Sequence, residues 1–191
     1  MVKNFAFHIR PAQVGDICVL LESVDDAEAT HLYHYQQTLQ ARFGGKAVVP
    51  VHLTCHRLEI QGDAQLATLH EALGQVLSTV SPFALTALSL QTLYVPVLGT
   101  CMLKWRVDVT DELRHFSYLV RDAVSRVGAT SLYAPDAVSS LVTALQGVGD
   151  LSSEALEIPN MFPHHLFTAA KVELSRIEGP NDFASLATLE F

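Results

Sequence analysis

The residues with the clearest capacity for chemistry lie in one short run, Val-His-Leu-Thr-Cys-His-Arg at 51–57. On a β-strand alternate side chains point to the same face, so His52, Thr54 and His56 are expected to share a face opposite an apolar set. An imidazole and a hydroxyl two residues apart can both donate hydrogen bonds to one phosphate group. The imidazole can also move a proton, because its ordinary pKa is about 6.5. The pair His52 and Thr54 therefore suits phosphodiester chemistry, with a solvated strand histidine as the plainer alternative.

Metal binding explains the same histidines poorly. His52 and His56 would lie about 13 Å apart on a strand that rises about 3.3 Å per residue, whereas zinc sits about 2 Å from each ligand nitrogen. The three cysteines, Cys18, Cys55 and Cys101, are widely spaced and form no CxxC pair, so they predict neither a thiolate zinc site nor a disulfide framework. We predict a cytoplasmic protein with no metal site and no cofactor.

Charge narrows the class of partner. A formal net charge of -8 gives no overall positive field, which argues against a DNA duplex or an anionic membrane as the partner. No apolar stretch reaches the length of a bilayer span. Any phosphate must therefore be bound by a local site. Lys104 and Arg106 share one face of a predicted strand and could give such a site positive charge, although solvated charges at a sheet edge show the same pattern.

The elements that must position these residues are indicated by hydrophobic spacing and by turn residues. Apolar residues at helical spacing, bounded by capping residues, proline or glycine, predict helices over 25–43, 66–77, 111–127 and 135–145. Alternating or β-branched runs predict strands over 5–9, 17–21, 46–60, 83–94, 100–109, 129–133, 166–177 and 183–191. The stretch 150–163 has no pattern and is predicted to be a loop.

This order of elements predicts an α+β fold. It lacks the regular strand–helix alternation of a parallel sheet, so we expect two pseudo-symmetric lobes of mostly antiparallel sheet, with outer helices and a central groove. With 191 residues, 49% of them apolar, the chain is expected to form a single domain, 1–191, of two intertwined lobes around a large core. No glycine-rich phosphate loop or dinucleotide fingerprint occurs.

The segment 46–128 resembles the two-histidine (2H) phosphoesterase superfamily, which includes 2',5' RNA ligases and cyclic nucleotide phosphodiesterases. Residues 50–54, Pro-Val-His-Leu-Thr, resemble the first His-x-Thr strand of that family. The helix at 66–77, Ser-Pro-Phe at 81–83 with its strand, the Lys-Trp-Arg-Val strand at 104–107 and the helix at 111–127 follow in family order, and the strands at 171–178 and 183–191 resemble its end. In that family two such motifs, one per lobe, face each other across a groove and act as general acid and base.

The second motif is where the sequence departs from the family. After the helix that ends at Gly128, the best match is Ala-Thr-Ser-Leu-Tyr at 129–133. Ser131 matches the hydroxyl position of the family motif, and Ala129 stands where its imidazole belongs. Three explanations remain open. In the first, the domain keeps only the His52 and Thr54 half of the site and has lost catalysis. In the second, another histidine supplies the second imidazole. In the third, the second motif lies at 164–165, although no Thr or Ser follows two residues after either histidine. The candidate histidines are His56, His164 and His165.

The resemblance implies a protein that acts on, or binds, an RNA terminus or a small 2',3'-cyclic nucleotide. If active, it would be a metal-independent cyclic phosphodiesterase or a 2',5' RNA ligase-like enzyme, with His52 as one acid/base and with Thr54 and Ser131 holding non-bridging oxygens. The alternative is a noncatalytic ligand-binding or protein-interaction module on the same scaffold. Two imidazoles within reach of one phosphate-sized space favour the enzyme, and a single imidazole favours the binding module.

Overall fold

The computed structural model describes residues 8–95, 99–149, 164–179 and 182–191. The helices in these ranges are α1 (Asp26–Phe43), α2 (Asp63–Leu77) and α3 (Asp111–Arg126). The strands are β1 (Ile17–Glu22), β2 (Lys46–Ala47), β3 (Leu53–Glu59), β4 (Phe83–Val95), β5 (Thr100–Val107), β6 (Thr130–Ser131), β7 (Leu141–Val148), β8 (His165–Ala169), β9 (Lys171–Gly179) and β10 (Asp182–Glu190).

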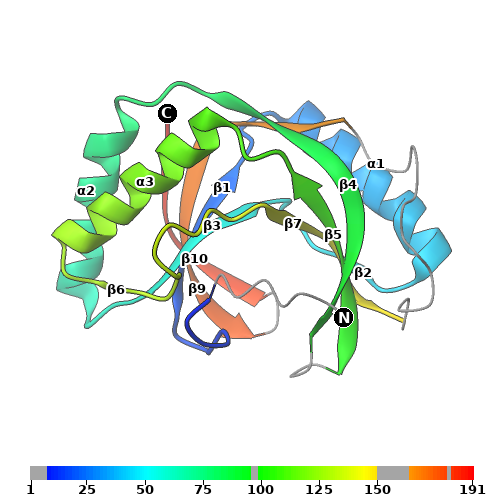
Figure 1. Cartoon of the computed structure of the whole chain (residues 1–191), viewed down its shortest axis with the longest axis horizontal. Coiled ribbons are helices and arrows are strands. Elements are labelled where there is room, and N and C mark those ends of the chain that lie inside the picture. Colours follow the sequence, from blue (N-terminus) through cyan, green and yellow to red (C-terminus); the bar gives the residue numbers. More distant parts are fainter. Residues whose placement is uncertain (1–7, 96–98, 150–163, 180–181) are drawn as a thin grey trace.

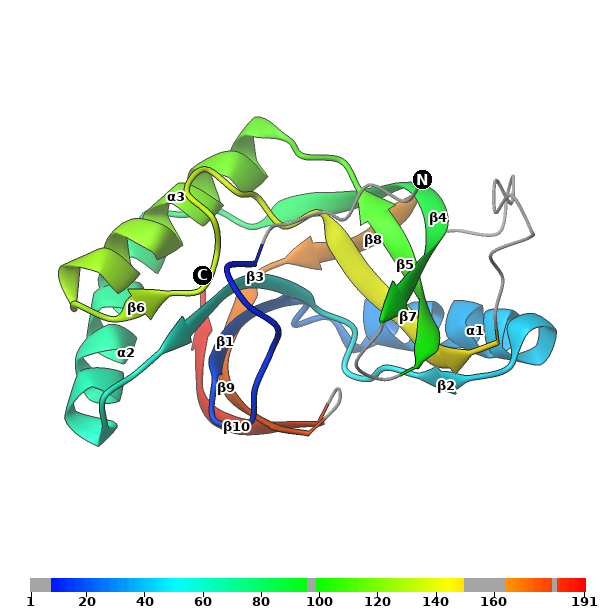
Figure 2. The ribbon, with the colours of Figure 1, turned by 60° about the horizontal axis from the view of Figure 1, so that its bottom comes forward.

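The described strands form one curled antiparallel sheet. Eight of them follow one another in the order β10-β9-β1-β3-β7-β5-β4-β8, while β2 joins β7 and β6 joins β3. β3 and β7 meet at the middle of this path. We call the strands β10, β9, β1 and β3 the β3 half, and the strands β7, β5, β4 and β8 the β7 half. Figure 2 shows β1, β9 and β10 curving on one side of the molecule and β4, β5 and β7 on the other. The predicted α+β class with antiparallel strands is confirmed.

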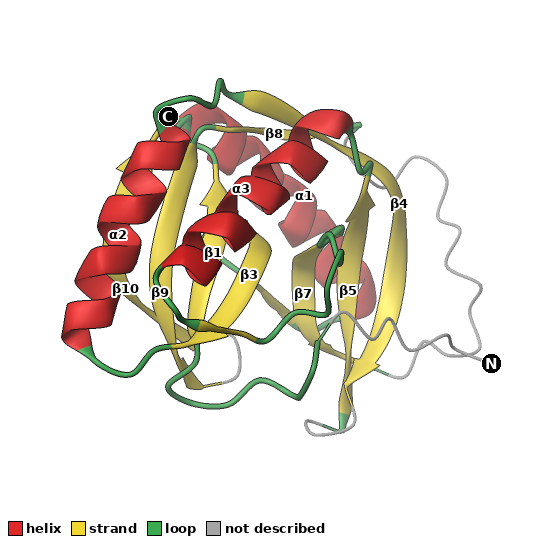
Figure 3. Cartoon of the chain, turned by 60° about the vertical axis from the view of Figure 1, so that its left-hand side comes forward, coloured by secondary structure: helices red, strands yellow, loops and turns green. Residues whose placement is uncertain are grey.

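The three helices lie on the outside of the sheet. α2 and α3 pack against each other and against strands of the β3 half, whereas α1 packs against β2, β7 and β8 (Figures 1 and 3). Asp25 caps α1 by accepting hydrogen bonds from the N–H groups of Ala27 and Glu28, and Thr110 caps α3 through the N–H of Leu113. These three helices were predicted from apolar spacing and are confirmed. No helix in the described ranges is long and apolar enough to span a bilayer.

The hydrophobic core lies between the sheet and the helices. Trp105 on β5, Phe116 on α3 and Phe167 on β8 are its largest fully buried side chains. Burial of one large apolar side chain contributes roughly 1.5–3 kcal/mol relative to exposure, so these contacts hold the strands firmly around the centre of the sheet. The predicted alternation on β5 is confirmed, since Trp105 faces the core and Lys104 faces away from it.

The helix predicted over 135–145 is wrong. The chain forms strand β7 there, between β3 and β5. A central strand is covered on both faces, and β7 is buried at four consecutive positions, 142–145. Such a strand loses the alternation of apolar and polar residues, and its apolar positions then imitate the spacing of a helix.

Two predicted strands are each divided in the structure. The strand expected over 46–60 consists of β2 and β3, separated by a non-strand segment that contains Pro50, which has no N–H to donate to a ladder. The strand expected over 166–177 consists of β8 and β9, separated by the single residue Ala170. β8 belongs to the β7 half and β9 to the β3 half, so the chain changes halves at this residue. The predicted strand 5–9 and loop 150–163 lie largely or wholly outside the described residues.

Candidate functional site

Two segments of the chain repeat the same order of elements around the centre of the sheet. β1-α1-β2-β3 and β5-α3-β6-β7 each run strand, helix, short strand, strand. In each segment the first strand pairs with the last, and the short strand crosses to pair with the last strand of the other segment. β3 and β7 pair antiparallel at Leu53 and Val142. The segments are therefore related by approximate two-fold symmetry about this residue pair.

The register identifies the corresponding residues of the two segments. Counting outward from the Leu53 and Val142 pair matches His52 with Leu141 and Thr54 with Thr143. The strand equivalent to the His-x-Thr strand thus carries Leu-Val-Thr at 141–143. It keeps the hydroxyl and replaces the imidazole by an apolar side chain.

The alignment that puts the second motif at 129–133 is therefore wrong. Those residues include β6, which pairs with the far end of β3 and is the counterpart of β2. The error follows from the predicted helix over 135–145. The motif is expected on a strand, and no strand was predicted where β7 lies.

A β-bulge at the same place in both strands supports this correspondence. It inserts one extra residue directly after each threonine, Cys55 on β3 and Ala144 on β7. Beyond the bulges, the register matches His56 with Leu145 and Arg57 with Gln146.

The bulge also decides which side chains of β3 share a face. Simple alternation puts His56 beside Thr54, and this prediction is wrong. The extra residue Cys55 turns His56 toward Tyr133, and the two rings stack with centroids 5.1 Å apart. Arg57 instead lies on the face of Thr54. His56 is buried, and burial lowers its pKa to about 4.

A cavity of about 210 Å³ lies where the two halves meet. Thr54 of β3, Thr143 of β7 and Lys104 of β5 contribute polar atoms to its lining. Leu141 and Phe183 contribute apolar surface to the same lining. The two corresponding threonines thus face one space, which is large enough for a phosphate group and part of what it esterifies.

Lys104 carries the main uncompensated charge in this cavity. Its cross-strand partner is Thr143, and its Nζ donates a hydrogen bond to Thr143 Oγ1 at 2.9 Å. No carboxylate within the described ranges forms an ion pair with Lys104. Burial lowers its pKa to about 8, so the amine remains mostly protonated at neutral pH and has further N–H donors for a ligand. The corresponding position in the β3 half is Leu20.

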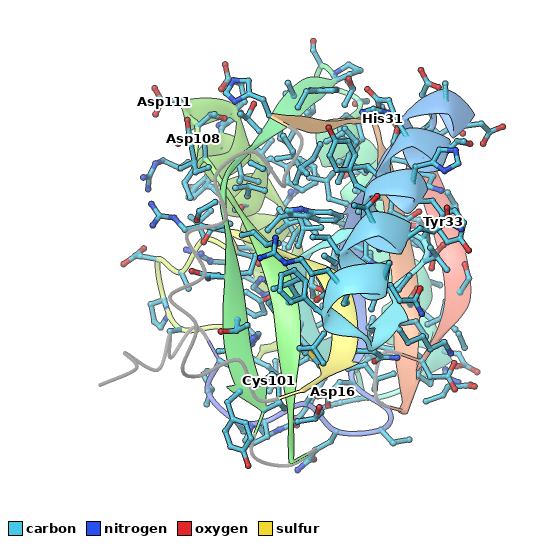
Figure 4. All side chains as sticks on the ribbon, turned by 90° about the vertical axis from the view of Figure 1, so that its right-hand side faces the viewer. Asp16, His31, Tyr33, Cys101, Asp108 and Asp111 are labelled. Carbon is cyan, nitrogen blue, oxygen red and sulfur yellow. The ribbon has the colours of Figure 1, made fainter. Side chains whose placement is uncertain are left out.

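Arg57 contributes less free charge, because an acidic residue already compensates it. Its Nε lies 3.4 Å from Oδ2 of Asp16, and both side chains are buried. Its Nη2 also donates to the backbone carbonyl of Arg10. Figure 4 shows Asp16 at the end of the molecule opposite to Asp108 and Asp111. Arg57 is thus fixed in place beside the cavity by the segment that carries Arg10 and Asp16.

His52 immediately precedes β3 and is not among the residues that line the cavity, but it contacts one of them. Its ring meets the ring of Phe183 edge-on, with centroids 5.3 Å apart, and Phe183 lines the cavity. Its Nδ1 donates a hydrogen bond to the carbonyl of Pro50 at 2.9 Å, which leaves Nε2 with the free lone pair in the neutral ring. Burial, together with the positive charge of Lys104, holds the pKa of His52 below its ordinary value. This imidazole is neutral at pH 7 and is suited to accept a proton.

His8 is a cavity residue that the sequence analysis missed. It precedes Arg10 in the N-terminal segment, and its ring lies edge-on to that of Tyr133, with centroids 4.7 Å apart. Desolvation at the cavity wall and the positive charges of Arg57 and Lys104 lower its pKa to about 4. No local signal identifies His8 from sequence, because only the folded segment brings it to this wall.

Comparison with solved structures identifies the fold. No protein-family model matches the sequence, and no curated protein matches it. Structures do match: a phosphoesterase with a TM-score of 0.64 at 14% identity, and E. coli LigT complexed with 3'-AMP with a TM-score of 0.64 at 14% identity. Each alignment covers 93% of this chain and 98% of the other. The chain has the LigT fold. LigT complexed with NADP+ matches equally widely, with a TM-score of 0.61 at 15% identity.

Within the LigT fold, the remaining predicted site residues lie away from the cavity. The hydroxyl of Ser131 bonds to the backbone of Tyr133. His164 is exposed, and His165 pairs through Nε2 with Glu28 of α1 at 2.9 Å. Arg106 lies on the same face of β5 as Lys104 but is exposed. The alignment of Ser131 with the second motif is excluded by the strand register above, and the roles predicted for His164, His165 and Arg106 stay predictions. No group of three or more His, Cys, Asp or Glu side chains able to hold a metal gathers in the described part of the chain.

Proposed function

We propose that this protein binds the phosphate of a nucleotide or RNA terminus, including a 2',3'-cyclic phosphate, in the cavity between β3 and β7. One observation carries the proposal. Lys104 is a largely buried cation that lacks a carboxylate partner among the described residues and lies next to a hydroxyl. A buried charge is costly unless it is paired, so an anionic ligand in this cavity would be favoured by its positive charge.

The neighbouring hydroxyls define the shape of the ligand. Thr54 and Thr143 approach the cavity from the two halves of the sheet, and both can donate to non-bridging oxygens of one phosphoryl group. The apolar lining, which includes Phe183 and Leu141, suits the uncharged part of a nucleotide. E. coli LigT has been solved in complex with 3'-AMP and with NADP+, which supports a nucleotide as the ligand class here.

His52 supports slow hydrolysis of a cyclic phosphate in addition to binding. Its neutral ring could take a proton from water as the water attacks phosphorus. The partner imidazole of the 2H motif pair is replaced by Leu141, and this observation favours the alternative of a noncatalytic binding module. Binding is therefore the primary proposed function, with metal-independent opening of a cyclic phosphodiester well below the rate of an intact two-histidine site.

Calorimetric titration with 2',3'-cyclic AMP, 3'-AMP and inorganic phosphate tests the proposal. We expect saturable binding of a nucleotide that weakens with salt and drops about tenfold or more in Lys104→Met, since hydrogen bonds to charged groups contribute about 1.5–3 kcal/mol. Lys46→Met is the matched control, because Lys46 is exposed on β2 and its loss removes the same charge. Equal affinities for Lys104→Met and wild type would overturn the site, and no binding of any probe would overturn the function.

A further inference from the structure

The β7 half has a proton donor although Leu141 stands at the position that corresponds to His52. Lys104 and Thr143 are direct cross-strand partners, so the ammonium group stands beside the hydroxyl that corresponds to Thr54. Leu141 lies two residues from Thr143 on the same strand and lines the same cavity. The Lys104 ammonium is therefore on the side of the cavity where the second acid/base group of a symmetric site would be.

Other titratable groups near the cavity are poor proton donors at neutral pH. His8 has its pKa lowered to about 4 and is unprotonated, and the lowered pKa of His52 makes it a base. Tyr133 uses its hydroxyl to donate to the carbonyl of Thr54 at 2.9 Å. Burial raises the pKa values of Tyr133 and of the Cys18 thiol. Arg57 is already engaged with Asp16 and with the backbone carbonyl of Arg10.

We propose that Lys104 is the general acid of this site and donates the proton that the leaving ester oxygen requires when a cyclic phosphodiester is opened. The inference rests on the proposed function, because it assumes that the phosphate binds beside Thr143. It assigns a specific chemical role to a residue outside both motif strands.

The step balances without a metal or a second reactant other than water. A water oxygen forms a bond to phosphorus while Nε2 of His52 takes one of the protons of that water. The bond between phosphorus and one ribose oxygen breaks, and the electron pair stays on that oxygen. Lys104 passes a proton from Nζ to the same oxygen and becomes a neutral amine. The products are a phosphomonoester and a free ribose hydroxyl, and proton exchange with solvent restores both side chains.

The environment of Lys104 sets the expected pH dependence. The charged and titratable groups that line the cavity with it are His8 of the N-terminal segment, Cys18 of β1, Arg57 of β3 and Tyr133, and none of them is a carboxylate. Beyond this lining lie His52, whose pKa Lys104 lowers, and Glu173 of β9, which acts on His52 in the opposite direction. With a free-protein pKa of about 8, the acid form of Lys104 is lost as pH rises through that value, so kcat/KM should fall on the alkaline side from about pH 8.

Lys104→Arg separates proton donation from charge. Arginine keeps the positive charge but does not give up its proton, so we expect nucleotide affinity within about threefold of wild type and turnover of 2',3'-cyclic AMP reduced about 10²-fold or more, in the presence of a chelator. The alkaline limb near pH 8 should also disappear. Adding Leu141→His to Lys104→Arg supplies a new acid at the symmetric position and should restore turnover by about tenfold or more. This rescue also shows that the arginine variant is folded.

The outcomes distinguish the two proposals. Wild-type turnover in Lys104→Arg would overturn the role of Lys104 as the acid and leave the binding site standing. Nucleotide binding without any wild-type turnover would likewise overturn the acid and retain the binding function. A wild-type protein that binds no nucleotide would overturn both.

Discussion

The two halves of the sheet share a backbone arrangement and divide the chemistry between them. The β3 half holds His52 and Thr54 and has Leu20 across the strand from the threonine. The β7 half holds Thr143, has an apolar residue in place of the histidine, and has Lys104 across the strand from its threonine. One half therefore has an imidazole beside its threonine and an apolar residue across the strand, and the other has an apolar residue beside its threonine and a cation across the strand.

This difference shows that backbone geometry and side-chain chemistry are independent in this fold. The strand order, the crossing short strands and the bulge after each threonine occur in both halves. The side chains around the threonines differ in size, charge and capacity for proton transfer. The LigT fold therefore determines where side chains can lie around the cavity, and the identity of those side chains determines which chemistry is possible there.

The largest effect is expected at His52, the proposed general base. His52→Ala should lower turnover of 2',3'-cyclic AMP by about 10²- to 10⁴-fold, the usual contribution of a general base, while nucleotide affinity changes little. His165→Ala is the matched control, since that histidine pairs with Glu28 outside the cavity. If His165→Ala abolished turnover while His52→Ala kept it, the assignment of His52 as the general base would be wrong.

The second prediction concerns His56, whose counterpart Leu145 is apolar. Because folding lowers the pKa of His56 from 6.5 to about 4, the folded state resists protonation. The resulting loss of folding stability is absent above pH 6.5. It grows as the pH falls from 6.5 to 4 and levels off below pH 4 at about 3 kcal/mol. His56→Leu introduces the residue type found at the corresponding position, Leu145. It should reduce the loss of unfolding free energy between pH 7 and pH 4 by about 3 kcal/mol. Urea denaturation at several pH values measures it, and an unchanged pH slope in the variant would contradict it.

A gain of function is expected from making the halves more alike. Leu141→His should raise turnover of 2',3'-cyclic AMP by about tenfold, because it puts a second imidazole at the position that corresponds to His52. Ala129→His is the control, since position 129 precedes β6 and lies outside the lining of the cavity. A larger gain from Ala129→His than from Leu141→His would refute the correspondence drawn from strand register.

The smallest effects are expected at the residues that the halves share. Thr54→Val and Thr143→Val should each weaken nucleotide binding by about three- to tenfold, because each removes one hydrogen-bonding hydroxyl and keeps the shape of the side chain. Isothermal titration of both variants compares the halves directly. A loss confined to one variant would indicate that the phosphate touches only one half.

Local patterns in the sequence were enough to predict most elements and the first motif. The capped helix at 111–127 and the alternation around Trp105 follow from residue spacing alone, and the predicted elements from 46 to 128 follow the order of a known fold family. His52 and Thr54 were identified as a pair for the same reason, because strand alternation over two residues needs no tertiary information.

The second half of the site could not be predicted in this way. β7 is buried on both faces, so its hydrophobic pattern imitates a helix and hides Thr143 and Leu141. The bulge at Cys55 reverses the expected facing of His56 and Arg57, and its position is set by pairing with β1. Lys104 was identified as a charged residue, but its lack of a carboxylate partner depends on strands that are distant in sequence.

The crossing of the chain at Ala170 has a consequence for synthesis on the ribosome. β1 is made early, yet its two neighbours in the sheet are β3 and β9, and β9 follows roughly 150 residues later in the chain. While translation proceeds, the edge of β1 that will pair with β9 has no partner strand. β3, which carries Thr54 and pairs with β1, therefore lies in an incomplete sheet. A ribosome-bound chain stalled before residue 171 should therefore lack the stable β3 half, even though the residues of the first motif have already been made.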